Sequence, residues 1–307
     1  MIAAVAAARE GCRVSLYEKN EKLGKKLFIT GKGRCNVTNA CDMEELFAAV
    51  VTNRKFLFSS FYSFTNEDVM ELFEQAGLPL KVERGNRVFP CSDHSSDVIA
   101  ALERMMRQEG VKVYLRHEIK GLAIQRKNDP ETGKEKPVCR GVLLEGFGGK
   151  LKTVEADAVI LATGGLSYPS TGSTGDGQQW AEQLGHKVTE LLPALVPFEA
   201  EEKEEVKALQ GLSLKNIEIA VYNGKKELYR DFGEMLFTHF GVSGPVILSA
   251  SSFCAKAVSR GPLKLMIDLK PALSAEQLDE RILKDFAEAK NKQFKNSLNH
   301  LYPAKLI

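Results

Sequence analysis

A lysine- and glycine-rich segment near the N-terminus has the composition of a phosphate-binding loop. It covers residues 19–39 and reads K-N-E-K-L-G-K-K-L-F-I-T-G-K-G-R-C-N-V-T-N. Gly31 and Gly33 let a ligand come close to the backbone, whose amides can then face phosphate oxygens, and Arg34 and the lysines add positive charge. The segment is not a P-loop, because Gly24 and Gly31 are seven positions apart rather than five. An ordinary solvated loop would have the same composition.

An acidic residue precedes this segment, at the end of a predicted strand. Residues 1–10 predict a helix that ends at Gly11, and residues 12–18 predict a short strand that ends on Glu18. This order matches the second half of a dinucleotide-binding βαβ unit, in which such an acid binds a ribose about 20 residues after a glycine fingerprint. That distance from Glu18 runs beyond Met1, so we expect the glycine turn and first strand of the unit to be absent. The alternative is a surface acid at a strand end.

Other reactive side chains give weaker signals. The six cysteines include no C-x-x-C pair and the five histidines no H-E-x-x-H, which predicts reduced thiols in the cytoplasm and no metal site. Cys35 could be a redox-active thiol, with its pKa lowered by Arg34. Because no second cysteine is suitably spaced, we interpret Cys35 as a packing residue. Ser243 is not in a nucleophile elbow, because Pro245 replaces the last glycine, and we predict a turn that begins a helix.

Composition and charge exclude several classes of protein. The 307 residues are 44% hydrophobic and 27% charged, as in ordinary globular proteins. With 42 basic and 40 acidic residues the net charge is 42 − 40 = +2, which argues against nucleic acid or an anionic membrane as a partner. The apolar residues 1–8 lack a basic leader, and no apolar run approaches the length of about 18 residues that a membrane helix needs.

The pattern of elements indicates an α/β chain. Helices are predicted at 43–50, at 54–62, from a capping pair Thr65 and Asp68 to Gly77, and at 96–109; strands are predicted at 111–115, 118–127, 138–145, 150–156 and 157–162. The strands from 118 to 156 form a predicted meander with a turn at 128–133, and 157–162 is a predicted strand buried on both faces. Further strands are expected at 212–222, 225–231 and 263–269, and a helix at 274–290 capped by Ser274.

Four motifs, in this order, resemble those of a family of bacterial NAD(P)/FAD-dependent oxidoreductases related to the bile-acid Δ4,6-reductase flavoproteins. They are G-K-G-R-C-N-V-T-N (31–39), A-V-I-L-A-T-G-G-L-S-Y-P (158–169), T-G-S-T-G-D-G (171–177) and F-T-H-F-G-V-S-G-P (237–245). The resemblance covers most of the chain. It implies an FAD-binding Rossmann-like domain of the two-dinucleotide-binding, three-layer type at 1–190, an inserted β-barrel-like domain at 191–269 and the start of a helical insert at 270–307. The chain looks truncated at both ends of this fold.

The resemblance also implies which residues bind the cofactor. Glu18 would hold the adenosine ribose, with Lys19 and Lys26 near the adenosine or pyrophosphate. The remaining implied ligands lie in glycine-rich turns: Thr30, Gly31, Gly33, Arg34, Cys35 and Asn36 along the pyrophosphate and flavin, then Ala162, Thr163, Gly164, Gly165 and Asp176.

The implied activity is hydride transfer from NAD(P)H through FAD to an electron-poor, unsaturated small molecule. No catalytic proton donor is assigned, since Tyr168, His239 and Ser243 in the motifs are interpreted as structural. One alternative is a non-catalytic fragment with impaired FAD binding, because loss of a central strand leaves unpaired edges. Fold analogy alone would also allow an FAD-dependent RNA-modifying protein, against which the near-neutral charge argues.

Overall fold

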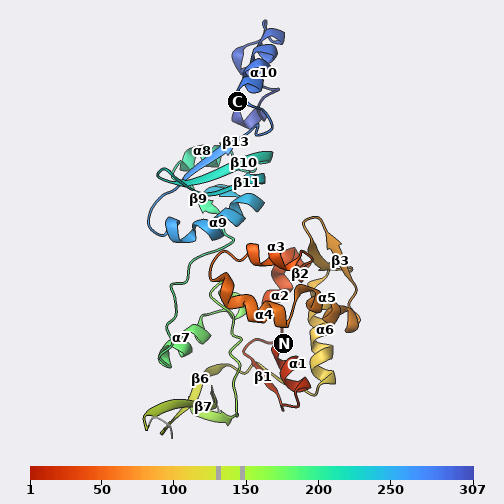
Figure 1. Ribbon diagram of the computed structural model, residues 1–307, viewed down its shortest axis with the longest axis vertical. Helices are drawn as coiled ribbons and strands as arrows, with labels where there is room; N and C mark the ends of the chain where they lie inside the picture. Colours follow the sequence, from red (N-terminus) through yellow and green to blue (C-terminus); the bar gives the residue numbers. More distant parts are fainter. Residues whose placement is uncertain (129–132, 146–148) are drawn as a thin grey trace. The chain divides into compact units, whose positions relative to one another are not determined.

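The computed structural model describes residues 1–128, 133–145 and 149–307 (Figure 1). The chain divides into two compact units, Met1–Thr189 and Glu190–Ile307. Each unit has its own hydrophobic core and is described by itself. No helix among the described residues is long and apolar enough to cross a membrane.

The first unit begins with a helix, a strand and the glycine loop. Its elements up to residue 108 are α1 (Ile2–Arg9), β1 (Ser15–Glu18), α2 (Lys25–Ile29), η1 (Thr30–Gly33), β2 (Thr38–Asn39), α3 (Met43–Ala48), η2 (Arg54–Leu57), α4 (Phe58–Ser63), α5 (Asn66–Gln75), β3 (Leu80–Glu83), β4 (Arg87–Pro90) and α6 (Ser95–Gln108). The unit continues with β5 (Lys112–Leu115), β6 (Ile119–Asn128), β7 (Glu135–Glu145), β8 (Leu151–Glu155), η4 (Pro169–Thr171) and α7 (Asp176–Gln183).

Three small sheets build this unit. Strands β1 and β5 pair in parallel, with Glu18 opposite Leu115, and β2, β4 and β3 form an antiparallel sheet. Helix α6 packs on α1 and α2 (Figure 1). Its buried residues recur at helical spacing, so one apolar face of α6 supplies much of the core; they are Val98, Ala101, Leu102, Met105 and Met106.

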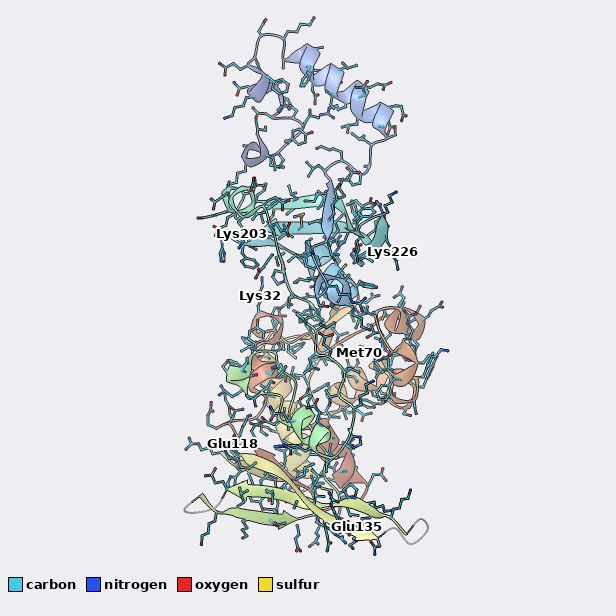
Figure 2. The ribbon with its side chains drawn as sticks, turned by 90° about the vertical axis from the view of Figure 1, so that its left-hand side faces the viewer. Lys32, Met70, Glu118, Glu135, Lys203 and Lys226 are labelled. Atoms are coloured by element: carbon cyan, nitrogen blue, oxygen red, sulfur yellow. The ribbon has the colours of Figure 1, made fainter. Side chains whose placement is uncertain are left out.

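The meander is formed by β6, β7 and β8, which pair antiparallel in sequence order. Figure 2 shows Glu118 and Glu135 toward opposite ends of this sheet, as expected from Asn128 pairing with Glu135 across the first hairpin. Most of the turn that the sequence predicts at 128–133 lies outside the described residues.

One strand prediction is wrong. Residues 157–162 were expected to form a strand buried on both faces, but they belong to no strand, and Ile160 and Leu161 have 63% and 41% of their surface exposed. An apolar strand is buried only where neighbouring strands satisfy its backbone groups and helices cover its faces. In the described part of the chain this segment has no such neighbours and pairs with no strand.

The second unit is a half-barrel, formed by one curled antiparallel sheet with a helix on it. Its elements are β9 (Phe198–Glu199), α8 (Lys203–Ala208), β10 (Ser213–Asn223), β11 (Lys226–Phe237), β12 (Gly241–Ser243), α9 (Pro245–Val258), β13 (Lys264–Asp268), α10 (Ala275–Glu288), α11 (Phe294–Ser297) and η5 (Ala304–Leu306), with sheet order β13-β10-β11-β12-β9.

Alternate residues of β10 point into the core of this unit. Ile217, Ile219 and Val221 are at most 2% exposed and pack with the buried face of α9, which includes Ile247. The predicted turn before α9 is confirmed, because Gly244 has a φ of 105° and Pro245 opens the helix.

Candidate functional site

Glu18 occupies the position where α/β folds bind ligands, the carboxyl end of a parallel strand. Its Oε1 accepts hydrogen bonds from the backbone nitrogen of Asn20 at 2.9 Å and from Asn20 Nδ2 at 2.7 Å. Asn20 Nδ2 also donates to the carbonyl oxygen of Thr171 at 3.1 Å. Asn20 therefore fixes the orientation of the Glu18 carboxylate. It also contacts a second glycine-rich segment, which contains Thr171.

Lys19 joins the two predicted cofactor segments. Its Nζ lies 2.9 Å from Asp176 Oδ2 and 2.7 Å from Thr174 Oγ1, although the lysine and the aspartate are 157 residues apart in the sequence. Lys26 adds a second link, since its Nζ donates to the carbonyl oxygen of Ser167. Burial raises the pKa of Asp176, but the hydrogen bonds from Lys19 and Thr174 outweigh burial, and the net pKa is below its usual value.

The turn at 162–165 packs tightly against the start of α7. A Cβ at Gly164 would lie 2.6 Å from Ser173 Oγ, and one at Gly177 would lie 2.6 Å from Thr163 Oγ1. Thr163 Oγ1 accepts a hydrogen bond from the Gly177 nitrogen at 3.1 Å. At both positions the absence of a Cβ leaves room for a hydroxyl side chain of the facing segment. Ala162 is exposed, and a Cβ added at Gly165 would lie 4.0 Å from the Gln178 side chain.

The loop from Thr30 to Asn36 has an unusual backbone. Gly31, Lys32, Gly33 and Cys35 all have positive φ, of 56°, 58°, 87° and 59°. Thr30 closes the loop, because its carbonyl oxygen accepts from the Cys35 nitrogen at 3.1 Å. Left-handed conformations at non-glycine residues are unfavourable and cluster at functional sites.

Two predicted residues of this loop, Arg34 and Asn36, make side-chain contacts within the protein. Arg34 pairs with Glu83 and Asp93. The amide of Asn36, with its nitrogen turned toward them, donates to the carbonyl oxygens of Thr38 at 2.9 Å and Val88 at 3.1 Å. Asn36 therefore ties the loop to β4.

Cys35 is buried, as expected of a packing residue, with 2% of its surface exposed. The expectation that Arg34 lowers its pKa is wrong. Burial raises the pKa of the Cys35 thiol, and the charge of Arg34 is taken up by carboxylates instead. A buried, protonated thiol is a poor nucleophile.

Two observations test whether these residues fit a dinucleotide cofactor. A Cβ at Gly33 would meet nothing within 4 Å, so the loop presents bare backbone to open space there. In the described part of the chain, Gln178 Oε1 is a buried acceptor without a hydrogen-bond partner, close to the 162–165 turn. Buried acceptors are normally satisfied, and a hydroxyl or N–H of a ligand would satisfy this one. Sequence reasoning missed Gln178 because its motif gave it no signal.

Residues 1–257 match the family described as the HI0933-like protein Rossmann domain. The chain belongs to this family of flavoprotein oxidoreductases. The resemblance inferred from the four motifs is thereby confirmed, as is the fold class, a Rossmann-like α/β domain with a half-barrel inserted into the family fold.

Curated relatives include two enzymes of different activity. The chain is 29% identical over 310 residues to the 3-dehydro-bile acid delta(4,6)-reductase of Clostridium scindens, covering 100% of this chain and 71% of the relative. It is also 29% identical over 309 residues to the ribosomal RNA dihydrouridine synthase of Haemophilus influenzae, covering 100% and 70%. Among solved structures, a flavocytochrome c3 fumarate reductase shares 19% identity over 69% of this chain and 44% of its own, with a TM-score of 0.41.

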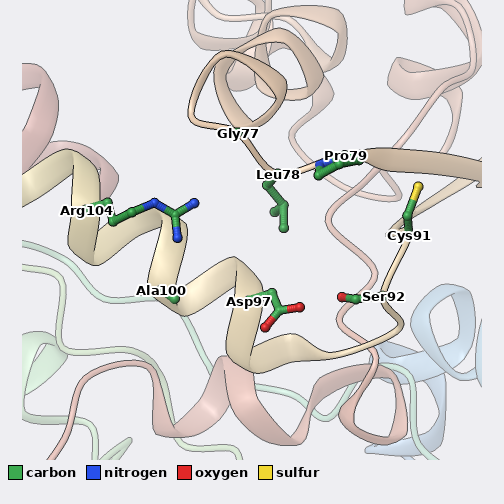
Figure 3. Close-up of a pocket in the computed structure, with 8 residues that line it drawn as sticks. All are labelled: Gly77, Leu78, Pro79, Cys91, Ser92, Asp97, Ala100 and Arg104. Carbon is green, nitrogen blue, oxygen red and sulfur yellow. The ribbon is translucent and has the colours of Figure 1, made fainter.

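Two pockets formed by described residues of this HI0933-like chain differ in their relation to the predicted site. One, of about 270 Å³, is lined by Cys91, Asp97 and Arg104 among others and includes no predicted cofactor residue (Figure 3). The other, of about 550 Å³, is next to the predicted site, because it is lined by Tyr17, the neighbour of Glu18 in the sequence. Tyr17 and Tyr114 line it, with their rings stacked 4.8 Å apart.

The residues considered as proton donors remain unassigned in this flavoprotein. Tyr168 is 65% exposed in the first unit, and His239 packs edge-on against Phe240 in the second, with ring centroids 4.9 Å apart. Ser243 lies opposite Leu236 in the β11–β12 ladder.

Proposed function

We propose that this chain is an FAD-dependent oxidoreductase that uses NAD(P)H to reduce a carbon–carbon double bond of a small unsaturated substrate. Family membership supports the oxidoreductase chemistry. One structural observation supports the cofactor: Lys19 joins the strand end at Glu18 to the segment of Asp176, so both predicted cofactor segments meet at the carboxyl end of β1. We place the activity in the cytoplasm, where thiols stay reduced.

Each part of the site has a role in this proposal. The Glu18 carboxylate would accept hydrogen bonds from the adenosine ribose, and the backbone of the 30–36 loop would pass along the pyrophosphate at Gly33. The turn at 162–165 and Gln178 would contact the remaining polar groups of the cofactor. Bound FAD would supply hydride transfer, while the protein binds and orients it.

The names of two relatives support this substrate class. A delta(4,6)-reductase and a dihydrouridine synthase, as named, both reduce a carbon–carbon double bond. A hydride adds most readily to such a bond when a carbonyl withdraws electrons from it. The balanced charge of +2 favours a small molecule over a polyanion. A uridine base in RNA is the second candidate, because this chain is as similar to the named synthase as to the named reductase.

The test begins with the visible spectrum of the purified chain after incubation with FAD and gel filtration. We expect a yellow protein that NADH or NADPH bleaches in the absence of oxygen. A cyclic enone is then added to one sample and a uridine-containing RNA to another, and return of the flavin band identifies the acceptor.

Each outcome has a defined meaning. A colourless protein after gel filtration would overturn the cofactor assignment and favour the non-catalytic alternative. If dithionite bleaches the bound flavin but neither NADH nor NADPH does, the proposal that NAD(P)H is the electron donor is overturned. If only the RNA reoxidises the flavin, a uridine base in RNA replaces the small molecule as the proposed substrate.

A further inference from the structure

Arg34 stands in the middle of the glycine loop, but two carboxylates from outside the loop occupy its guanidinium. Nη2 donates to Glu83 Oε1 at 2.5 Å, and Nη1 lies 3.3 Å from Glu83 Oε2, so both ends of the fork contact one carboxylate. Nε donates to Asp93 Oδ1 at 2.8 Å. These partners are 49 and 59 residues further along the chain.

Phe89 and Lys81 also belong to the surroundings of Arg34. Its guanidinium carbon lies 4.2 Å from the centre of the Phe89 ring, within the range of a cation–π contact. Lys81 Nζ lies 2.6 Å from Asp93 Oδ2. The two carboxylates therefore pair with both Arg34 and Lys81, so the charge of Arg34 is largely neutralised within the protein.

The backbone on both sides of Arg34 explains what such an anchor would do. Lys32 lies two residues before Arg34 and Cys35 follows it directly, and both have left-handed φ, of 58° and 59°. Such residues persist only where their surroundings hold them. The Glu83 and Asp93 contacts fix the one side chain that lies between them.

We propose that Arg34 is a positioning residue, which anchors the 30–36 loop to the β3–β4 hairpin and the Asp93 turn, and not a ligand of the cofactor. The inference rests on the proposed function in one respect, that this loop is the part of the chain that meets FAD. It replaces the phosphate-binding role that the sequence suggests for Arg34.

The two roles predict opposite effects when the carboxylates are neutralised. In a Glu83→Gln/Asp93→Asn double variant Arg34 keeps its charge but loses both carboxylate partners, and the neutral amides that replace them hold a guanidinium less firmly. If Arg34 positions the loop, FAD binding weakens. If Arg34 binds phosphate directly, removal of the competing carboxylates leaves FAD binding unchanged or tightens it.

The experiment measures two properties of the full chain: the FAD dissociation constant by flavin fluorescence, and amide hydrogen exchange of residues 30–36 without FAD. We expect Arg34→Met and the double variant each to weaken FAD binding about tenfold or more, as for lost charge-assisted hydrogen bonds, and to speed exchange in the loop. Arg34→Lys keeps the positive charge but lacks the forked guanidinium, so its FAD dissociation constant should lie between those of the wild type and Arg34→Met. Unchanged or tighter FAD binding by the double variant overturns the proposal.

Arg230 provides a matched control. This arginine of the second unit also contacts two carboxylates, Glu218 and Glu227, and its side chain is 45% exposed against 35% for Arg34. Arg230→Met should leave FAD binding and loop exchange unchanged. If the wild-type chain binds no FAD, the proposed function fails, and exchange alone decides: faster loop exchange in Arg34→Met supports the anchor, and unchanged exchange overturns it.

Discussion

The ion pair of Lys19 and Asp176 should be a measurable link between the two cofactor segments. Their charged atoms are 2.9 Å apart, and the side chains are 24% and 29% exposed. Fully exposed pairs contribute about 0–1 kcal/mol, and removal of one partner of a buried pair costs about 3–5 kcal/mol. This half-buried pair, supported by Thr174, should lie near the top of the exposed range, with a coupling free energy of about 1 kcal/mol.

A double-mutant cycle measures this coupling. Lys19→Met, Asp176→Asn and the double variant are unfolded in urea, and unfolding is followed by tryptophan fluorescence. The chain has one tryptophan, Trp180, which is 8% exposed and lies in α7, the helix that begins at Asp176. The probe therefore reports on the segment that the ion pair holds.

The pH dependence has a definite sign. The folded pKa of Asp176 is below its ordinary value of 3.8, so its contribution to stability is fully present above that value. It is lost as the pH falls through the folded pKa. The coupling should therefore be constant from about pH 5 to pH 8 and decline only in stronger acid.

Two results would refute the argument. One is a coupling below about 0.3 kcal/mol at pH 7, the level at which independent sites add. The other is an equal coupling in a control cycle of Lys25 and Glu21, an i,i+4 pair on the surface whose glutamate is 48% exposed. The control joins neighbours in sequence and should not move the Trp180 transition.

Three further predictions concern stability and reactivity. Gly141→Ala should lower the free energy of urea unfolding by about 3 kcal/mol, because the new Cβ would lie 1.9 Å from a carbonyl oxygen of β8. The control Gly121→Ala, whose Cβ would lie 3.6 Å from its nearest neighbour, should lower it by less than about 1 kcal/mol. Ile247→Ala should cost about 2–5 kcal/mol by the same measurement, since this side chain is 0% exposed; a smaller loss would mean that the core closes around the cavity. Cys35, whose thiol pKa burial raises, should react with iodoacetamide at pH 7.5 much more slowly than exposed Cys91, by mass spectrometry; equal rates would contradict its burial.

Local signals in the sequence located several elements correctly. At the start of α5 the Thr65 hydroxyl accepts a hydrogen bond from the Asp68 nitrogen, and the Asp68 carboxylate accepts one from the Thr65 nitrogen, as the capping pair predicts. Helix α6 ends at the predicted place, where Gly110 has a φ of 70°. These features depend on residues within one helical turn, so the sequence contains all the information that determines them.

The partners of the site residues were not predictable in this way. Arg34 contacts Glu83 and Asp93 only because the β3–β4 hairpin and the turn after it fold against the loop. No spacing rule in the sequence links these residues. The strand prediction at 157–162 failed for a related reason. Its apolar composition is compatible with a buried strand, but strand formation requires partners that composition does not supply.

The pairing of β1 with β5 has a consequence for the order of folding. Ser15 lies opposite Lys112, and Lys19 contacts Asp176, so the strand end at Glu18 is completed only after distant segments meet. In contrast, β10 and β11 form a hairpin in which Asn223 lies opposite Lys226. Local contacts form faster than distant ones, because closing a long loop costs more chain entropy. When the full chain refolds, we therefore expect the β10–β11 hairpin to form early and the candidate cofactor site to be assembled late, so most of the folding precedes any stabilisation by FAD.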